Sequence, residues 1–217
     1  ITGAYVNKRI EFEDTISSVK EFNNKLYVLL KKGILYELNP ITDELIEIIN
    51  LVGELEINNE DGLLGFDASP YNHFMISYVN KDRLLIFEKY YYSGNLKNIT
   101  SSEILLTEQN NTGVHYGGDV LWSNHYENYI ISIGDFASSS SGAIYNTSPI
   151  DTTVYPGKVI LLDNSSKIKN IPHTGNKDGV PKENILAYGF RNPWKLSEYR
   201  NYLMIFDVGM NVYEELN

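Results

Sequence analysis

Short hydrophobic segments alternate with polar segments along the chain. The hydrophobic segments are rich in Tyr, Ile, Val and Phe, which favour the pleated surface of a β-strand, and Asn, Gly, Asp and Ser separate them. No stretch shows a convincing helical period. Gly33 lies between KLYVLL and ILYEL and is typical of a hairpin turn. We therefore expect strands at 25–30, 34–38, 44–49, 63–69, 74–79, 83–90, 119–122, 128–134, 157–163, 184–190 and 201–209.

A long series of short strands predicts an all-β fold, which is a sandwich, a barrel or a propeller. A propeller blade of four strands takes about 40–45 residues, so 217 residues make about five blades at most. The segment 136–157 is rich in Ser, Thr and Gly and is expected to be a long loop. Such a loop is either a functional lid or a disordered segment.

Charge and cysteine content narrow the classes of function. The formal net charge is −10, with 28 acidic and 18 basic residues, which argues against nucleic-acid binding and suits a neutral ligand or a cation. The chain has no cysteine, which excludes disulfides, thiolate metal sites and cysteine nucleophiles. The sequence contains no run of eighteen apolar residues, so it predicts no membrane-spanning helix. The chain begins at Ile1 without a signal-peptide pattern, so we expect a chain processed or cut from a longer one.

Two polar residues at the borders of predicted strands are candidates for acid–base chemistry. His115 lies in GVHYGG, just before a strand, and an imidazole can act as a general base near neutral pH. Asp135 ends the strand in IISIGD, where a carboxylate can orient a neighbouring histidine. The alternatives are a turn histidine bonded to a carbonyl and a turn-forming aspartate.

Further candidates lie near the middle and the end of the chain. Arg191, in GFRNPW, carries a guanidinium suited to carboxylates and polarised carbonyl oxygens, and its alternative is a surface position. The acidic residues around Gly209 in DVGMNVYEELN suit Ca²⁺, but they lack EF-hand spacing and also fit a solvated turn. Glu60 precedes a predicted buried strand in EDGLLGFDASP and by itself fits a charged loop.

The order of these motifs is more specific than any one of them. The succession EDGLLGFDASP, HYGG, SIGD, PGKVILLD, AYGFRNPW and DVGMNVYEELN resembles the soluble glucose/sorbosone dehydrogenase family, from about residue 60 to residue 217. The resemblance implies a six-bladed β-propeller that uses pyrroloquinoline quinone (PQQ) to oxidise aldose sugars. The chain would then cover roughly the first four blades, as a single domain over 1–217 that is incomplete at its C-terminus.

The resemblance also implies roles for the candidate residues. His115 matches the base that takes the proton of the sugar's anomeric hydroxyl, before hydride passes from that carbon to the quinone. Asp135 matches the acid that orients this histidine. Arg191 matches the arginine that polarises the quinone, and Asn192 matches a residue that contacts the cofactor. Glu60 lies where the family often has Gln or Glu near the substrate.

A calcium site and the protein's partners follow from the same resemblance. Gly209 and Met210 match the pair whose main-chain carbonyls hold Ca²⁺ against the cofactor, and Glu215 matches an acid that can bind a structural Ca²⁺. The family implies an external electron acceptor, a periplasmic or extracellular location, and a homodimer as one assembly state.

The chain departs from the family pattern in two respects. Met210 stands where some members have proline, a change that a carbonyl contact tolerates. The basic residues that grip the carboxylates of PQQ belong to later blades and have no match here. Two other functions therefore stay open. One is a non-catalytic extracellular propeller that serves as a binding module. The other, which gives the Arg-Asn-Pro block no role, is a sugar-lactone hydrolase-like propeller with a central Ca²⁺.

Overall fold

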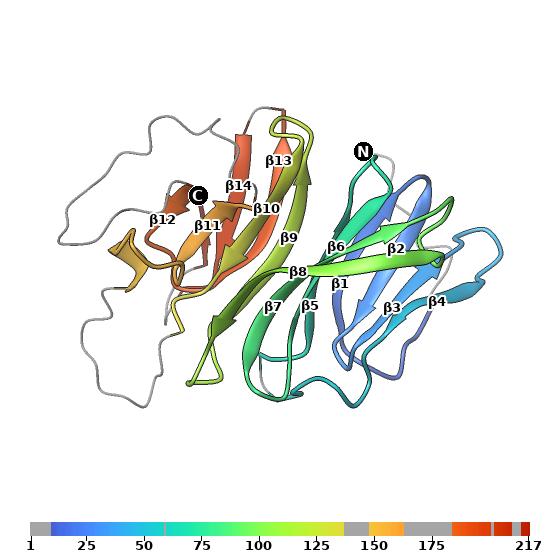
Figure 1. Ribbon diagram of the computed structural model, residues 1–217, viewed down its shortest axis with the longest axis horizontal. Coiled ribbons are helices and arrows are strands. Elements are labelled where there is room, and N and C mark those ends of the chain that lie inside the picture. The colour runs from blue at the N-terminus through green and yellow to red at the C-terminus, as the bar shows by residue number, and fades with distance from the viewer. Residues whose placement is uncertain (1–9, 59, 137–147, 163–183, 201, 210–213) are drawn as a thin grey trace, which may run out of the picture.

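The computed structural model consists of four antiparallel β-sheets (Figure 1). It describes residues 10–58, 60–136, 148–162, 184–200, 202–209 and 214–217. The first sheet holds β1 (Ile16–Phe22), β2 (Lys25–Leu30), β3 (Ile34–Leu38) and β4 (Leu45–Asn50), and the second holds β5 (Leu63–Ala68), β6 (His73–Val79), β7 (Leu84–Tyr92) and β8 (Ile99–Gln109). The third sheet holds β9 (Gly117–Ser123), β10 (Asn128–Ile133), β11 (Lys158–Leu161) and β12 (Ile185–Tyr188), and the fourth holds β13 (Pro193–Tyr199), β14 (Tyr202–Asp207) and β15 (Glu215–Leu216).

Strands that follow each other in the chain pair within each sheet, and the first strand of each sheet contacts the first strand of the next. The pairing order is β1-β2-β3-β4 in the first sheet and follows the chain in the other three. Strand β5 contacts β1 and β9, and β9 contacts β13. The sheets are therefore successive blades of a propeller, with β1, β5, β9 and β13 as the inner strands. The predicted all-β propeller, with about four blades, is confirmed.

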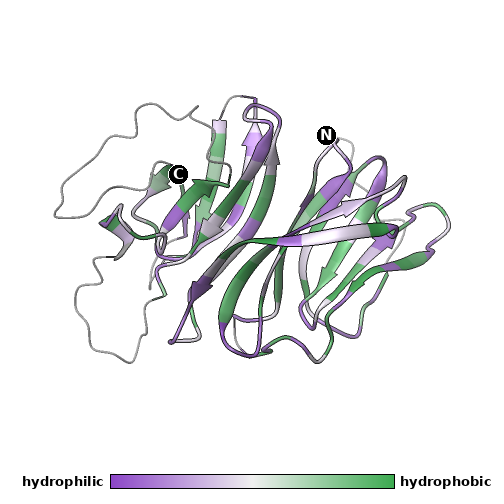
Figure 2. Ribbon diagram, viewed as in Figure 1, coloured by the Kyte–Doolittle hydropathy of each residue, from purple (hydrophilic) through white to green (hydrophobic). Residues whose placement is uncertain are grey.

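The hydrophobic core lies between neighbouring blades. One cluster joins the first two sheets and includes Leu29, Leu35, Phe66 and Phe74. A second cluster joins the second and third sheets around Phe87, Tyr129 and Ile131, among others. Hydrophobic positions concentrate on the strands, whereas many of the connecting turns are hydrophilic (Figure 2). Within the parts of the chain that the structure describes, no helix is long and apolar enough to cross a membrane.

Most expected strands are present, with borders that shift by a few residues. The hairpin at Gly33 is confirmed, and that glycine has φ +114°. The segment expected at 184–190 ends as a strand at Tyr188. Four strands lie outside the expected segments, namely β1, β8, β13 and β15. Of the expected 136–157 loop, residues 137–147 lie outside the described residues, and Ser148–Ile150 form a short 3₁₀ helix.

Candidate functional site

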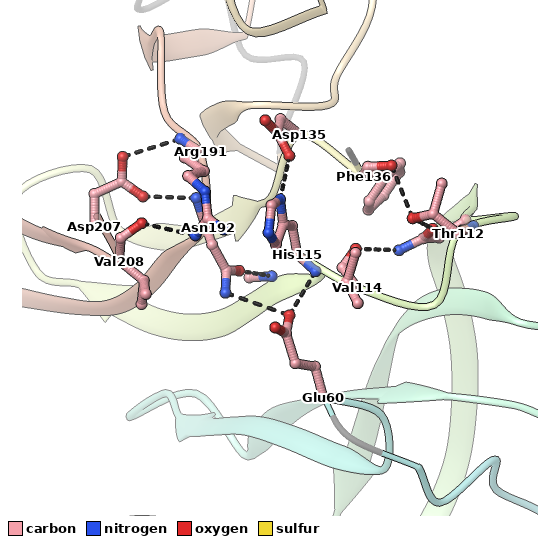
Figure 3. Close-up of polar contacts among 12 residues, drawn as sticks. Glu60, Thr112, Val114, His115, Asp135, Phe136, Arg191, Asn192, Asp207 and Val208 are labelled. Carbon is pink, nitrogen blue, oxygen red and sulfur yellow. Dashed lines mark hydrogen bonds and ion pairs between the residues drawn. The ribbon is translucent and has the colours of Figure 1, made fainter. Parts of the chain in front are cut away.

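Five of the predicted site residues meet at one end of the inner strands (Figure 3). Glu60 precedes β5, His115 precedes β9, and Arg191 with Asn192 precedes β13. The inner strands of successive blades run in the same direction, so the segments that precede them lie around one end of the central axis. Asp135 joins them because it follows β10, which runs antiparallel to β9. Residues distant in sequence are thus brought into one site.

His115 and Asp135 form a buried pair. The Nδ1 atom of His115 lies 2.7 Å from Oδ1 of Asp135. A carboxylate at this distance favours the tautomer in which Nδ1 carries the hydrogen, so that Nε2 has a free lone pair. Among the described residues, Nε2 has no hydrogen-bond partner. The pair therefore presents a nitrogen that can accept a proton.

The backbone of His115 adopts a left-handed conformation that its neighbours hold in place. Its φ is 55°, which is uncommon outside glycine. The main-chain N–H of His115 donates to the carboxylate of Glu60. Gly134 lies so close that a Cβ on it would be 1.8 Å from the His115 carbonyl oxygen. Backbone strain of this kind persists where surrounding contacts fix it, and such positions are enriched at functional sites.

Arg191 is positioned by the buried carboxylate of Asp207. Oδ2 of Asp207 accepts the main-chain N–H of Arg191 at 2.9 Å, and Oδ1 accepts that of Asn192 at 2.6 Å. Burial raises the pKa of Asp207, and these two N–H donors act in the opposite direction. Nη1 of Arg191 donates to the carbonyl of Val208 at 3.1 Å. The remaining guanidinium N–H groups have no partner among the described residues and are available to a ligand.

Asn192 connects two of the segments that form the site. Its Oδ1 accepts the main-chain N–H of Gly117 at 2.8 Å, and its Nδ2 lies 3.5 Å from the Glu60 carboxylate. Asn192 is buried, and both ends of its amide are in contact with protein. We expected a cofactor contact from Asn192 and a substrate contact from Glu60; the structure adds a role in which both hold the His115 segment.

The sequence pattern did not single out Asp207 and Gly134 for these contacts. From the sequence, Asp207 is a candidate only as one of the acidic residues of DVGMNVYEELN that suit Ca²⁺. In the structure its two carboxylate oxygens accept main-chain N–H groups. An aspartate at a strand end commonly binds nearby N–H groups, which is the signal that points to this role. Gly134 lies beside Asp135 in the IISIGD motif, and a glycine there can permit close approach of another backbone.

The expected calcium ligands are partly described. Gly209 donates its N–H to the Glu214 side chain at 3.1 Å. Glu215 is exposed on β15, and its backbone lies opposite Asp207 of β14 in the sheet. Met210 lies outside the described residues. Groups of three or more His, Asp or Glu residues that could hold a metal are absent from the described part of the chain. The expected site uses two main-chain carbonyls, so its assignment stays a prediction.

Solved structures with the same fold include several sugar dehydrogenases. An oxidoreductase of Thermus thermophilus, described as a glucose dehydrogenase, matches 94% of this chain with a TM-score of 0.72 and 15% identity. The soluble aldose sugar dehydrogenase of Escherichia coli, in its apo form, matches 94% with a TM-score of 0.71 and 19% identity. The holo form of the PQQ domain of pyranose dehydrogenase from Coprinopsis cinerea matches 94% with a TM-score of 0.62 and 16% identity.

The matches differ in length from this chain. The aligned part of this chain covers 61% of the Thermus thermophilus chain, 60% of the Escherichia coli chain and 48% of the Coprinopsis cinerea chain. No protein-family model and no curated protein matches the sequence. At these identities the likeness is one of fold. The propeller fold implied by the sequence resemblance is therefore confirmed for the four described blades, which have the fold of the corresponding part of the soluble sugar dehydrogenase structures.

Proposed function

We propose that this chain forms the catalytic part of a PQQ-dependent dehydrogenase that oxidises the anomeric carbon of aldose sugars. The observation that carries the proposal is the buried His115–Asp135 pair, in which Nδ1 and Oδ1 are 2.7 Å apart. Arg191, held by Asp207, lies at the same end of the inner strands. The names of the structural neighbours, which include a soluble aldose sugar dehydrogenase and a PQQ domain, support the same chemistry.

His115 is the proposed general base. Its Nε2 takes the proton from the anomeric hydroxyl, while Asp135 keeps the ring oriented and stabilises the imidazolium that forms. The anomeric carbon gives up its hydrogen as a hydride, so the sugar loses two protons and two electrons in all and becomes a lactone. PQQ, when bound, supplies the electrophilic carbonyl that takes up this hydride.

Arg191 is the proposed electrostatic residue. Its position is fixed before a ligand arrives, because Asp207 and the Val208 carbonyl hold it. A preorganised cation lowers the energy of negative charge that develops on a nearby oxygen. The free guanidinium N–H groups fit a quinone oxygen. Asn192 can contribute Nδ2 if that group turns from Glu60 toward the cofactor.

Other parts of the proposal rest on the resemblance. The carbonyls of Gly209 and Met210 would hold Ca²⁺, with Glu215 at a further calcium site. Residues that grip the PQQ carboxylates would come from outside this chain. An external electron acceptor, a homodimer and a periplasmic or extracellular location belong to the same proposal.

PQQ binding to the longest natural chain that contains this sequence, with and without Ca²⁺, tests the proposal. We expect Arg191→Ala to weaken binding about 10- to 100-fold, because a charge-assisted hydrogen bond is lost. Arg200→Ala is the matched control, since Arg200 is exposed on the β13–β14 turn and contacts Tyr199. Equal binding by the Arg191→Ala variant and the parent would contradict the proposed cofactor site.

The proposed base is tested separately from cofactor binding. In the longest natural chain that contains this sequence, reduction of an artificial acceptor with aldoses should fall about 10²- to 10⁴-fold in His115→Asn, while PQQ binding is retained. If the unaltered chain binds PQQ and oxidises no aldose, the propeller is a binding module and the dehydrogenase proposal fails.

A further inference from the structure

A pocket lies at the opposite end of the strands from the candidate site. It has a volume of about 400 Å³ and is lined on two sides by the β5–β6 turn and the β9–β10 turn. Glu60 precedes β5, and the pocket residue Tyr71 follows that strand. His115 precedes β9, and the pocket residue Trp122 lies near the end of that strand. Strands of six and seven residues, at about 3.3 Å per residue, place the pocket about 20 Å from the catalytic pair.

Interlocked aromatic rings form the pocket wall. The ring of Trp122 is 5.8 Å from Tyr71, 5.5 Å from His73 and 5.0 Å from Tyr129, and all three rings stand nearly edge-to-face with it. Rings that pack on each other in this way are fixed before a ligand binds, which reduces the entropy cost of binding. The volume falls within the range of roughly 300–1,000 Å³ that small-molecule sites occupy.

Hydrogen bonds inside this wall leave specific polar atoms available. The Tyr129 hydroxyl donates to the His73 carbonyl at 3.1 Å and lies 3.0 Å from Nδ1 of His73. Nδ1 therefore carries the hydrogen and donates to the Tyr129 oxygen, and Nε2 is an acceptor. Among the described residues, Nε2 of His73 and Nδ2 of Asn128 have no partner. The pocket thus offers one acceptor and one donor group.

The charges around the pocket nearly cancel. Burial and then Lys89 lower the pKa of His73 to about 4, so its ring is neutral at pH 7. Lys89 forms an ion pair with Glu103 at 3.5 Å, and Glu127 contributes one negative charge at the rim. A ligand with a net charge would gain little here, whereas a neutral molecule with several hydroxyls fits.

We propose that this pocket binds the ring of a neutral pyranose sugar, at a site separate from the catalytic one. The C–H groups on one face of a pyranose carry partial positive charge and suit the negative face of an aromatic ring, here Trp122 or Tyr71. The hydroxyls around the sugar ring pair with His73 and Asn128. The site would hold a sugar that is not being oxidised, and it does not depend on PQQ or on the proposed reaction.

The indole N–H signals of the chain report on binding directly. The sequence has two tryptophans, Trp122 in the pocket and Trp194 in β13. Methyl α-D-glucopyranoside is the probe, because its blocked anomeric hydroxyl prevents oxidation. In ¹⁵N spectra we expect saturable shifts of the Trp122 signal, assigned with Trp194→Phe, and none of the Trp194 signal. Glucose 6-phosphate should bind more weakly than the neutral probe.

Variants of exposed residues separate this site from the rest of the molecule. Tyr71→Ala should weaken binding of the probe about three- to tenfold, which corresponds to the binding free energy of one aromatic contact. Tyr202→Ala is the matched control, because Tyr71 is 57% exposed and Tyr202 is 72% exposed. Arg191→Ala should leave the Trp122 shifts unchanged. The proposal is overturned if the Trp122 signal does not move, if Tyr71→Ala binds like the parent, or if Arg191→Ala abolishes the shifts.

Discussion

At the scale of single residues, one buried carboxylate determines where the key arginine lies. Asp207 accepts the main-chain N–H groups of both Arg191 and Asn192. Asp207→Ala would leave two buried donors without an acceptor. We expect it to lower the free energy of unfolding by about 3 kcal/mol, and Asp207→Asn, which keeps one acceptor oxygen, to lower it less. Urea denaturation measures both changes.

A surface acid provides the comparison for Asp207. Asp82 is exposed and its side chain makes no hydrogen bond among the described residues, so Asp82→Ala should change the free energy of unfolding by less than about 0.5 kcal/mol. The Asp207 variants should also weaken PQQ binding, because Arg191 loses its support. Stability and PQQ binding at parent levels in Asp207→Ala would show that the arginine turn is held by other contacts.

His73 should make the fold sensitive to acid. Its folded-state pKa, about 4, lies below the ordinary value of 6.5, so the unfolded chain takes up the proton first as the pH falls. The resulting stabilisation is complete above pH 6.5 and is lost as the pH falls toward 4. It amounts to about 3 kcal/mol at most.

Urea midpoints between pH 7 and pH 4 test this dependence. We expect His73→Gln to flatten the acid side of the stability profile, because glutamine does not titrate. His125→Gln serves as the control, since His125 is exposed on the β9–β10 turn. Parallel profiles for the parent and His73→Gln would mean that other groups cause the loss of stability in acid.

At the scale of elements, the approach of neighbouring inner strands depends on glycine. A Cβ on Gly65, in β5, would lie 2.4 Å from the Gly118 carbonyl oxygen in β9 and 2.9 Å from the Val120 nitrogen. Both contacts are with backbone, which cannot turn away as a side chain can. Gly65→Ala should therefore push two blades apart and cost about 3 kcal/mol of unfolding free energy.

A glycine in open space provides the reference for this cost. A Cβ on Gly94 would meet nothing within 4 Å, and its φ of +78° alone would make Gly94→Ala cost about 1 kcal/mol. Thermal or urea unfolding of the two variants measures the difference. If Gly65→Ala were no more destabilising than Gly94→Ala, the blades would have room to adjust.

The strands that could be predicted from sequence are those with continuous apolar runs. KLYVLL and NYIISI are mostly buried on both faces, so hydrophobicity alone locates them. Strand β8, ITSSEILLTEQ, is largely exposed, and β1, ISSVKEF, alternates between exposed and partly buried positions. Both carry too many polar residues to be recognised by hydrophobicity. Strand β13 begins at Pro193, which reads as a turn, although its ring fits the first position of a strand.

At the scale of the whole molecule, the order of the motifs carried information that no single motif contained. Taken singly, His115 and Asp135 each fit an ordinary turn and Arg191 fits a surface position, and the structure brings all three to one end of the inner strands. The contacts of Asn192 and Glu60 could not be read from the sequence. They depend on which segments the propeller places side by side, with the two partners 132 positions apart in the chain.

The outermost blades of the described chain should make it self-associate. Val19 on β1 is 51% exposed and Phe206 on β14 is 42% exposed, and exposed apolar residues on sheet surfaces favour contact between molecules. We expect sedimentation velocity of residues 1–217 to show larger species as concentration rises. The double variant Val19→Thr/Phe206→Thr should shift this association to higher concentration. Ile41→Thr should not, although Ile41 is 86% exposed, because it lies on a turn. A monomer at every concentration would show that these faces are tolerated in water.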